Sequence, residues 1–512
     1  MSLAVVYTRA NVGVDAPLVT VETHLANGLP SLTIVGLPET AVRESRERVR
    51  CAILNANLEF PARRITINLA PADLPKSGGR FDLAIAISIL AASGQLPAQR
   101  LAGVEILGEL ALTGELRSVQ GVLPALLAAR DAGRQLLLPR GNQVETSLVR
   151  DVQAFSAEHL LQVFQYLQTG TGMQACCYDE LAHGHSVLPG SERFAQIKGQ
   201  RHAKRALCVA AAARHNILLI GPPGTGKTML ANALTELLPP LTEKEALEAA
   251  AIKSISGQVI DALQWRRPVF RSPHHTATSV ALVGGGKQAS PGEVTLAHRG
   301  LLFLDELTEF RRSALEGLRE PLESAAITVS RANYRLQFPA DFQLVAAMNP
   351  CPCGYYGDPQ GRCSCPPERV QRYLEKISGP LLDRIDLIVE VPRIPHDELR
   401  SRPASTDADE AEVAALRESI QVCRARQLER SGQLNSELDI RELDRVCALS
   451  PDCEALLQRA VKSLGLSARA CHRVLKIART IADLEQREEI LVADLSEAIA
   501  YRRHARLLKV GA

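Results

Sequence analysis

Gly221-Pro-Pro-Gly-Thr-Gly-Lys-Thr228 follows the predicted strand 216–220, Asn-Ile-Leu-Leu-Ile, and precedes the helical run 229–238. A glycine-rich loop between a strand and a helix is the context that a P-loop requires. The glycines let successive backbone N–H groups converge on phosphates, and the helix N-terminus adds a partial positive charge there. We expect Lys227 to reach the β- and γ-phosphates and the Thr228 hydroxyl to take a place on Mg²⁺. The stretch therefore predicts an ATP-binding α/β domain.

Two further strand ends carry polar residues that nucleotide hydrolysis needs. The apolar run 301–304 ends in Asp305 and Glu306, and the run 343–348 ends at Asn349. We predict that Asp305 holds Mg²⁺ through water and that Glu306 is the general base that polarises the attacking water. Asn349 is predicted to orient that water; the alternative is an asparagine that caps a turn before a proline. The predicted nucleotide- and magnesium-binding residues are Gly221, Pro222, Pro223, Gly224, Thr225, Gly226, Lys227, Thr228 and Asp305.

The composition limits the class of protein. The 512 residues are 46% hydrophobic and 23% charged, which is the balance of an ordinary globular protein of several domains. The formal net charge of +2 demands no nucleic-acid or membrane partner, so any such contact must come from a local patch. We find no apolar stretch of about 18 residues that would cross a bilayer. We therefore expect a cytoplasmic protein whose 12 cysteines are mostly reduced.

The pattern of apolar residues divides the chain into four regions. Residues 1–168 mix short apolar strands with helical runs, and residues 169–191 have the composition of a linker. Residues 192–395 alternate strands and helices, which predicts a doubly wound parallel sheet with helices on both faces. Residues 396–512 are helical in pattern, which predicts a C-terminal helical domain.

Five longer stretches point to one family. They are Phe270-Arg-Ser-Pro-His-His275, Pro291-Gly-Glu-Val-Thr-Leu-Ala-His-Arg-Gly-Leu-Leu-Phe-Leu-Asp-Glu306, Met348-Asn-Pro-Cys-Pro-Cys-Gly354, Ser378-Gly-Pro-Leu-Leu-Asp-Arg-Ile-Asp386 and Ala478-Arg-Thr-Ile-Ala-Asp483. With these stretches the chain resembles AAA+ ATPases and, within them, the magnesium-chelatase-like group called YifB or ComM. The resemblance covers essentially the whole chain.

This resemblance implies a hexameric ring with ATP at the subunit interfaces, and it makes residues 396–512 the helical lid of the AAA+ domain. It makes Asn349 the first sensor. It suggests Arg469 as the second sensor, with Arg473 one turn later as the competing choice.

The resemblance also gives Arg384 a role that the residues alone do not favour. By itself, an arginine between two acids indicates an ion pair with Asp383 or Asp386. The resemblance instead makes Arg384 the arginine finger that one subunit supplies to its neighbour.

Residues 1–168 resemble the Lon-type protease domain, with an informative departure. The protease pattern places its serine in Pro-Lys-Asp-Gly-Pro-Ser-Ala-Gly, whereas this chain has Pro75-Lys-Ser-Gly-Gly-Arg-Phe-Asp82. Arg80 therefore occupies the nucleophile position, and Leu123 occupies the position of the family lysine. Ser77 lies three residues too early in this alignment. Because Arg and Leu can neither attack a carbonyl nor act as its base, we expect a Lon-protease-like domain without peptidase activity.

Four of the cysteines form a cluster. Cys351-Pro-Cys353 and Cys363-Ser-Cys365 are separated by nine residues rich in Gly, Pro and Asp. Two Cys-x-Cys pairs on a loop suit tetrahedral Zn²⁺, whereas four shielded thiols without metal are the alternative. We predict a structural zinc site just after Asn349.

Two insertions are candidates for DNA contact. Residues 253–290 are basic and include Lys287. Residues 326–338 have the pattern of a β-hairpin with Arg331 and Arg335 and no acid. Basic hairpins in a ring of nearly neutral average charge could hold a phosphate backbone, with ordinary solvated charge as the alternative. The resembling proteins place both insertions toward the ring pore.

Two functions compete at this stage. The first is an ATP-driven DNA translocase or helicase, since family members of the ComM type drive branch migration of recombination intermediates during natural transformation. The second is a protein-remodelling ATPase like the ATPase subunit of magnesium chelatase. An ATP-dependent protease is disfavoured by Arg80 and Leu123.

Overall fold

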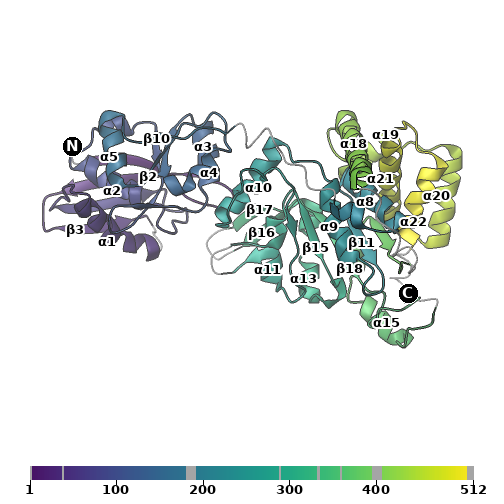
Figure 1. Ribbon diagram of the computed structural model, residues 1–512. Helices are drawn as coiled ribbons and strands as arrows, with labels where there is room; N and C mark the ends of the chain where they lie inside the picture. The colour runs from purple at the N-terminus through teal and green to yellow at the C-terminus, as the bar shows by residue number, and fades with distance from the viewer. Residues whose placement is uncertain are drawn as a thin grey trace. The chain divides into compact units, whose positions relative to one another are not determined.

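The computed structural model describes residues 3–36, 40–179, 192–286, 290–330, 335–357, 360–394 and 406–503. The chain folds into two compact units (Figure 1). The N-terminal unit contains residues 1–187 together with 243–266, and the C-terminal unit contains residues 188–242 together with 267–512. Among the described residues, no helix combines the length and apolarity that a bilayer span requires.

The N-terminal unit is built on a mixed sheet of eight strands in the order β10-β9-β8-β5-β1-β2-β4-β3. Helix α2 packs on β1 and β2, and all of its residues are buried because it lies between the sheet and α1. The strands are β1 (Leu3–Arg9), β2 (Leu18–Ala26), β3 (Ser31–Val35), β4 (Arg64–Ala70), β5 (Val104–Ile106), β8 (Gln135–Pro139), β9 (Ala154–Ala157) and β10 (Gln174–Ala175), with the short pair β6 (Glu109–Leu110) and β7 (Leu116–Arg117). The helices are α1 (Thr40–Asn55), α2 (Asp82–Ala92), α3 (Val122–Asp131), α4 (Gln143–Thr146) and α5 (Leu160–Thr169).

Helix α10 (Glu243–Ile255) also belongs to the N-terminal unit. It packs on α3. Its small apolar side chains are buried, among them Ala246, Ala249 and Ile252. Residues 243–266 lie in the region 192–395 by sequence, yet they fold against the first part of the chain.

The C-terminal unit contains a parallel sheet of five strands in the order β12-β15-β18-β11-β19. Its strands are β12 (Phe270–Arg271), β15 (Leu301–Leu304), β18 (Gln343–Met348), β11 (Ile217–Ile220) and β19 (Leu387–Glu390). The central strands are continuous apolar runs because both faces of the sheet are covered.

Alternate residues of these strands enter two different cores. Ile217 and Leu219 of β11 pack toward α8 (Arg201–Ala213) and α9 (Lys227–Leu237), whereas Leu218 joins a second core on the opposite face. The predicted doubly wound parallel sheet is therefore confirmed. The other elements of this unit are α7 (Glu192–Gln196), α11 (Ser279–Val283), α12 (Glu293–Leu296), α13 (Arg312–Glu316), α14 (Pro321–Ser324), α15 (Pro367–Leu374) and α16 (Gly379–Leu382), with the short pair β13 (Gly284–Gly285) and β14 (Ser290–Pro291).

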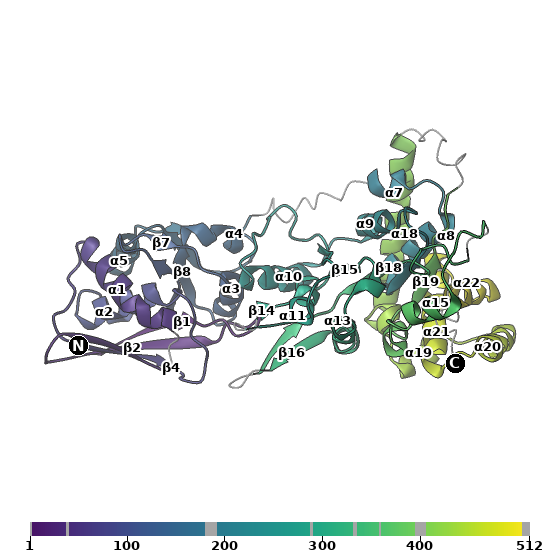
Figure 2. The ribbon, with the colours of Figure 1, turned by 90° about the horizontal axis from the view of Figure 1, so that it is seen from below.

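The C-terminal helices begin and end where their capping residues lie. Ser450 and Ser467 accept hydrogen bonds from the first turns of α20 and α21, and Gly465 ends α20 with a φ of 63°. Both views place α18 and α21 beside α8 (Figures 1 and 2). The helices are α18 (Thr406–Ser431), α19 (Ile440–Val446), α20 (Pro451–Leu464), α21 (Ala468–Leu484) and α22 (Val492–Arg503).

The predicted hairpin is present. Strands β16 (Ala326–Ser330) and β17 (Arg335–Pro339) pair in antiparallel register, with Ser330 opposite Arg335. Ile327, Leu336 and Phe338 are buried, which fixes one face of the hairpin against the protein. Lys287 and Arg331 lie outside the described residues.

Candidate nucleotide site

The predicted nucleotide-binding residues lie together at one edge of the parallel sheet. Strands β11, β15 and β18 are neighbours and run in the same direction, so the residues that follow them lie at the same edge. These are the P-loop after β11, Asp305 and Glu306 after β15, and Asn349 after β18. Ligands of open α/β sheets bind at this carboxyl edge.

The P-loop needs glycine at three positions. Gly224 and Gly226 have φ angles of 76° and 85°, in the left-handed region that other residues avoid. A Cβ at Gly221 would lie 2.2 Å from the carbonyl oxygen of Val391. The loop therefore holds a conformation in which its N–H groups can face a phosphate, and other side chains at these positions would distort it.

Lys227 occupies the centre of the loop and is 9% exposed. Its ammonium donates to the carbonyl oxygens of Gly221 at 2.7 Å and Pro222 at 2.9 Å, and to Oδ1 of Asn349 at 3.1 Å. Burial lowers the pKa of Lys227, although the carboxylates of Asp305 and Glu306 oppose that change. The predicted phosphate-binding lysine and the predicted sensor asparagine are therefore in direct contact.

The two predicted magnesium-binding residues are also adjacent. The Thr228 hydroxyl donates to Oδ2 of Asp305 at 2.7 Å, while the other carboxylate oxygen accepts from the backbone N–H of Glu306 at 2.9 Å. A hydroxyl and a carboxylate are oxygen donors of the kind that Mg²⁺ prefers. The side chains present therefore fit a magnesium ion bound with ATP.

Glu306 is held by a residue that the sequence did not mark as catalytic. Its Oε2 lies 3.3 Å from Nδ1 of His275, and its backbone has a φ of 51°, which is unusual for glutamate. His275 follows β12, which pairs with β15, so the sheet brings the two residues together. A histidine a few residues beyond the strand beside the Asp-Glu strand is the signal that could have identified it.

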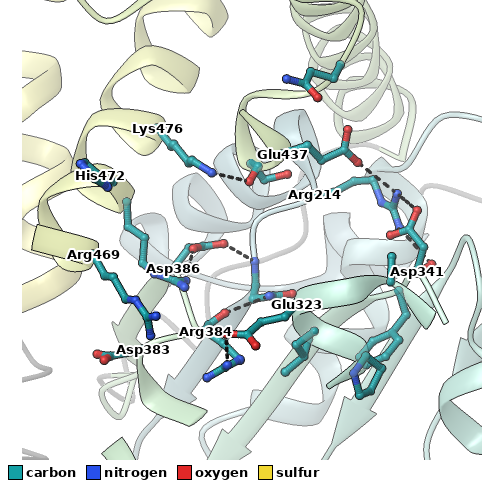
Figure 3. A pocket seen from close by; sticks show the side chains of 18 residues that line it. Arg214, Glu323, Asp341, Asp383, Arg384, Asp386, Glu437, Arg469, His472 and Lys476 are labelled. Atoms are coloured by element: carbon teal, nitrogen blue, oxygen red, sulfur yellow. Dashed lines mark hydrogen bonds and ion pairs between the residues drawn. The ribbon is translucent and has the colours of Figure 1, made fainter. Parts of the chain in front are cut away.

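A second group of charged residues lies at the opposite, amino edge of the same sheet. Asp386 and Arg384 directly precede β19, and Asn216 precedes β11. The backbone N–H of Asn216 donates to Asp386 at 3.0 Å, and its side chain donates to the carbonyl oxygen of Arg384 at 2.9 Å. A cavity of about 660 Å³ opens here and is also lined by Arg469 and Arg473 of α21 (Figure 3).

Arg384 does not make the ion pair that its neighbours in sequence suggested. Its guanidinium pairs with Glu323 of α14 instead of Asp383 or Asp386, and it donates to the carbonyl oxygen of Pro380 at 2.5 Å. Asp386 is instead occupied by Arg473, His215 and the backbone N–H of Asn216. Arg384 is 7% exposed, whereas the Glu323 side chain is 58% exposed, so the partner can leave more easily than the arginine.

Arg473 has a structural partner. Its guanidinium donates to Asp386 at 2.6 Å, and His215 lies 3.4 Å from the other oxygen of the same carboxylate. Burial by itself raises the pKa of Asp386, but the charge of Arg473, together with the neighbouring His215 and the backbone N–H of Asn216, outweighs burial and holds the pKa below its ordinary value. Arg473 thus joins α21 to the sheet through Asp386, while Arg469 also lines the cavity.

The four clustered cysteines come together. Three of the sulfur–sulfur distances are 3.3 Å (Cys351 to Cys353), 3.8 Å (Cys351 to Cys363) and 3.7 Å (Cys353 to Cys363). All four Sγ atoms, including that of Cys365, lie within 4.8 Å of one another. Zn–S bonds of about 2.3 Å in a tetrahedron place the sulfurs about 3.8 Å apart, so the donor set fits zinc.

The candidate DNA-binding residues are only partly described. Arg335 is exposed at the start of β17. Within the other basic insertion, Arg271 is engaged by Glu293 at 2.7 and 2.9 Å and has a structural partner. Of the three candidates, Arg335 is thus the one within the described residues, and its side chain is exposed.

Comparison with known proteins identifies the family. Models described as magnesium chelatase, subunit ChlI, as subunit ChlI of Mg-chelatase, and as the C-terminal part of magnesium chelatase subunit ChlI match residues 193–399, 21–142 and 410–502. Competence protein ComM of Haemophilus influenzae is 50% identical over 512 residues, which cover 99% of each chain. Protein YifB of Salmonella typhimurium is 48% identical over 508 residues, which cover 99% of this chain and 98% of its own. The magnesium-chelatase 38 kDa subunit of Cereibacter sphaeroides is 27% identical over 179 residues, 31% of this chain and 52% of its own. The chain therefore belongs to the ComM/YifB family of magnesium-chelatase-like AAA+ ATPases.

Proposed function

We propose that the chain hydrolyses ATP as part of a ring and completes each active site across a subunit interface. The observation that carries this proposal is the separation of two charged groups within one chain. Lys227 and Glu306 lie at the carboxyl edge of the sheet, whereas Arg384 and Arg469 lie at the amino edge. Strands of four to six residues, which span about 13 to 20 Å, separate the two edges. The arginines therefore suit the ATP of a neighbouring subunit.

Each side chain at the carboxyl edge has a role that follows from its position. Mg²⁺, when bound, supplies positive charge that neutralises and orients the phosphates. Lys227 exchanges the loop carbonyls for phosphate oxygens, which leaves Asn349 available to orient the attacking water. Glu306 accepts a proton from that water once its carboxylate leaves His275.

The cavity at the amino edge suits an anion from outside the chain. Arg384 and Arg469 line it, and the only acid paired with Arg384 among the described residues is the exposed Glu323. A neighbouring triphosphate would replace Glu323 as the partner of Arg384. Such head-to-tail contacts close into a ring, and the family resemblance implies six subunits.

Zinc at the cysteine cluster is part of this proposal. The first ligand, Cys351, lies two residues after Asn349, and Gly354 packs so closely on Pro223 of the P-loop that a Cβ there would lie 2.5 Å from the proline ring. A metal that orders the cysteine loop would therefore also support the sensor and the P-loop. Its role would be structural, because four sulfur ligands leave no open position.

Purified protein should contain about one zinc per chain, since four thiolates form one tetrahedral site. Changing Cys351 and Cys353 to Ser should remove the metal and weaken ATP binding, as measured by elemental analysis and nucleotide titration. Cys51→Ser, in the N-terminal unit, is the matched control and should keep the metal. Metal-free protein after purification without chelators would contradict the zinc site.

We further propose that the ring moves on DNA and that the β16–β17 hairpin helps to hold it. Arg335 is exposed at the tip-proximal end of β17, and Arg331 lies in the segment that joins the strands. Guanidinium groups there would neutralise backbone phosphates without reading sequence. The decisive experiment is whether single-stranded or forked DNA stimulates ATP hydrolysis.

A double change of Arg331 and Arg335 to Ala should weaken DNA binding and abolish DNA unwinding, with near-normal basal ATP hydrolysis. The slope of log affinity against log salt should become shallower by about 0.9 for each lost duplex phosphate contact. Gln337→Ala is the control, because Gln337 shares the exposed face of β17 but carries no charge. Unchanged DNA affinity and slope with failed ring assembly would show that these arginines are structural.

The name of the ComM relative suggests a setting for this activity. We propose that the chain acts in the cytoplasm as a helicase or branch-migration translocase in homologous recombination during natural transformation. Protein remodelling, as by a magnesium chelatase subunit, is the other outcome of the DNA-stimulation assay. ATP hydrolysis that no DNA structure stimulates would favour it.

A further inference from the structure

The N-terminus of α3 is capped by residues from distant parts of the chain. The first N–H groups of a helix need acceptors from outside the helix. The backbone N–H of Gly121 donates to the carbonyl oxygen of Ser254 at 2.9 Å. The N–H of Leu123 donates to the Ser254 hydroxyl oxygen at 3.2 Å and to the Glu145 carboxylate at 2.9 Å. Ser254, near the end of α10, is therefore a cap for a helix more than a hundred residues earlier.

The contact between Ser254 and the start of α3 is buried, and it includes the charged side chains of Glu145 and Arg80. Ser254 is 4% exposed, and its hydroxyl also donates to the Glu145 carboxylate. Burial raises the pKa of Glu145 and lowers the pKa of the neighbouring Arg80 to about 10. Arg80 points its guanidinium toward the carbonyl oxygens of Gln120 and Gly121, 3.4 and 3.5 Å away. A single serine thus completes a polar cluster that has little access to water.

The place of this cluster in the N-terminal unit is informative. Arg80 and Leu123 are the two positions at which the protease resemblance would place a nucleophile and a lysine. Here they lie against α10, a part of the N-terminal unit that comes from much later in the sequence. The residues Arg80, Gly121, Leu123 and Glu145 therefore form a binding site for Ser254 of α10. We call these four residues the socket.

Both ends of the docked segment lead into the nucleotide site. Helix α9, which begins with Lys227 and Thr228 of the P-loop, ends at Leu237, shortly before α10 begins at Glu243. Shortly after residue 266, strand β12 leads to His275, which contacts Glu306. The chain therefore connects α10 on one side to the phosphate-binding helix and on the other to the histidine that contacts Glu306.

We propose that the docking of Ser254 in this socket couples the N-terminal unit to the nucleotide state of the ATPase. The proposal rests on the proposed ATP site, and it assigns the N-terminal unit a role without peptidase chemistry. Coupling requires that ATP binding and α10 docking change each other's equilibrium by the same factor.

The first arm of the test displaces α10. Ser254→Asp places a second carboxylate against Glu145 and should release the helix. Hydrogen exchange reports this directly, because the amide of Gly121 loses its acceptor and the amide of Leu123 loses one of its two acceptors, so that both should exchange faster, Gly121 the more. Ser256→Asp is the matched control: it adds the same charge just beyond the end of α10, where the native hydroxyl donates to the carbonyl oxygen of Ile252 in that helix. Retained protection of β2 and β4 shows that the unit is still folded.

The second arm measures the coupling. The affinity for a magnesium-bound non-hydrolysable ATP analogue should change by about five-fold or more in Ser254→Asp, but not in Ser256→Asp. In the unaltered protein, the same analogue should change the protection of the Gly121 and Leu123 amides by a matching factor. If the analogue loosens the contact between Ser254 and the socket, then releasing α10 must tighten analogue binding. If the analogue tightens this contact, then releasing α10 must weaken analogue binding.

Released α10 with unchanged analogue affinity, together with amides that do not respond to the analogue, would overturn the coupling. Failure of the ATP site itself looks different, since the analogue would then not bind to the unaltered protein at all. If Ser254→Asp unfolds the unit, the response of the two amides in the unaltered protein still decides the question.

Discussion

Replacing Glu306 with Gln should leave ATP binding intact and slow hydrolysis by a factor of roughly 10² to 10⁴. Gln has the shape of Glu but cannot accept a proton from water. Thr228 and Asp305 bond to each other independently of the Glu306 side chain, so the magnesium-binding pair should persist. Single-turnover hydrolysis and nucleotide titration on the same preparation separate the two effects.

Two further variants serve as an inactive and an active control for Glu306→Gln. Lys227→Ala should abolish turnover, since it removes the buried ammonium that the loop surrounds. Glu309→Gln changes a nearby exposed acid that pairs at 3.8 Å with Lys376, and it should hydrolyse ATP normally. Near-normal turnover by Glu306→Gln would mean that another group is the base.

Arg384→Ala should bind ATP but lose a factor of roughly 10³ or more in hydrolysis rate. The arginine lies at the opposite edge of the sheet from its own P-loop, so it has no route to the phosphates of the same chain. Glu323→Gln is the informative companion variant. It removes the carboxylate that pairs with Arg384 but leaves the Arg384 guanidinium in place. We expect Glu323→Gln to remain active.

Mixing variants tests whether the site is shared. In a mixed ring, a Lys227→Ala subunit supplies an intact Arg384 to the intact P-loop of an Arg384→Ala neighbour. ATP hydrolysis should therefore recover partly when the two inactive proteins are combined. No recovery at any ratio, in rings shown to be mixed by mass measurement, would exclude catalysis by Arg384 across the interface.

The carboxyl-edge site was predictable because its signals are local. A P-loop shows itself as strand, glycine loop and helix, and the Asp-Glu pair and Asn349 each directly follow an apolar run. A parallel sheet brings such residues to one edge whatever the details of packing. The cysteine cluster was predictable for the same reason, since four thiols within 15 residues can meet without help from the rest of the fold.

The remaining features depend on packing between distant segments. The contact of His275 with Glu306 requires β12 to pair with β15, and the Arg384–Glu323 pair requires α14 to lie beside the start of β19. From the sequence, Asp383 or Asp386 was the expected ion-pair partner of Arg384, because a sequence shows only which residues are adjacent along the chain. The docking of Ser254 is likewise invisible to periodicity, since a serine near a helix end is ordinary.

Residues 243–266 belong to the N-terminal unit, so the polypeptide passes between the two units three times. A protease that cuts only between residues 169 and 191 would therefore leave the two halves joined by the other two crossings. A fragment that ends at Asp179 would lack Ser254 and expose the start of α3, while the complementary fragment would carry α10 without the surface that covers its alanines. The smallest piece of the N-terminal unit that can be expected to fold alone is thus residues 1–179 fused to 243–266, and no continuous stretch of the chain matches it.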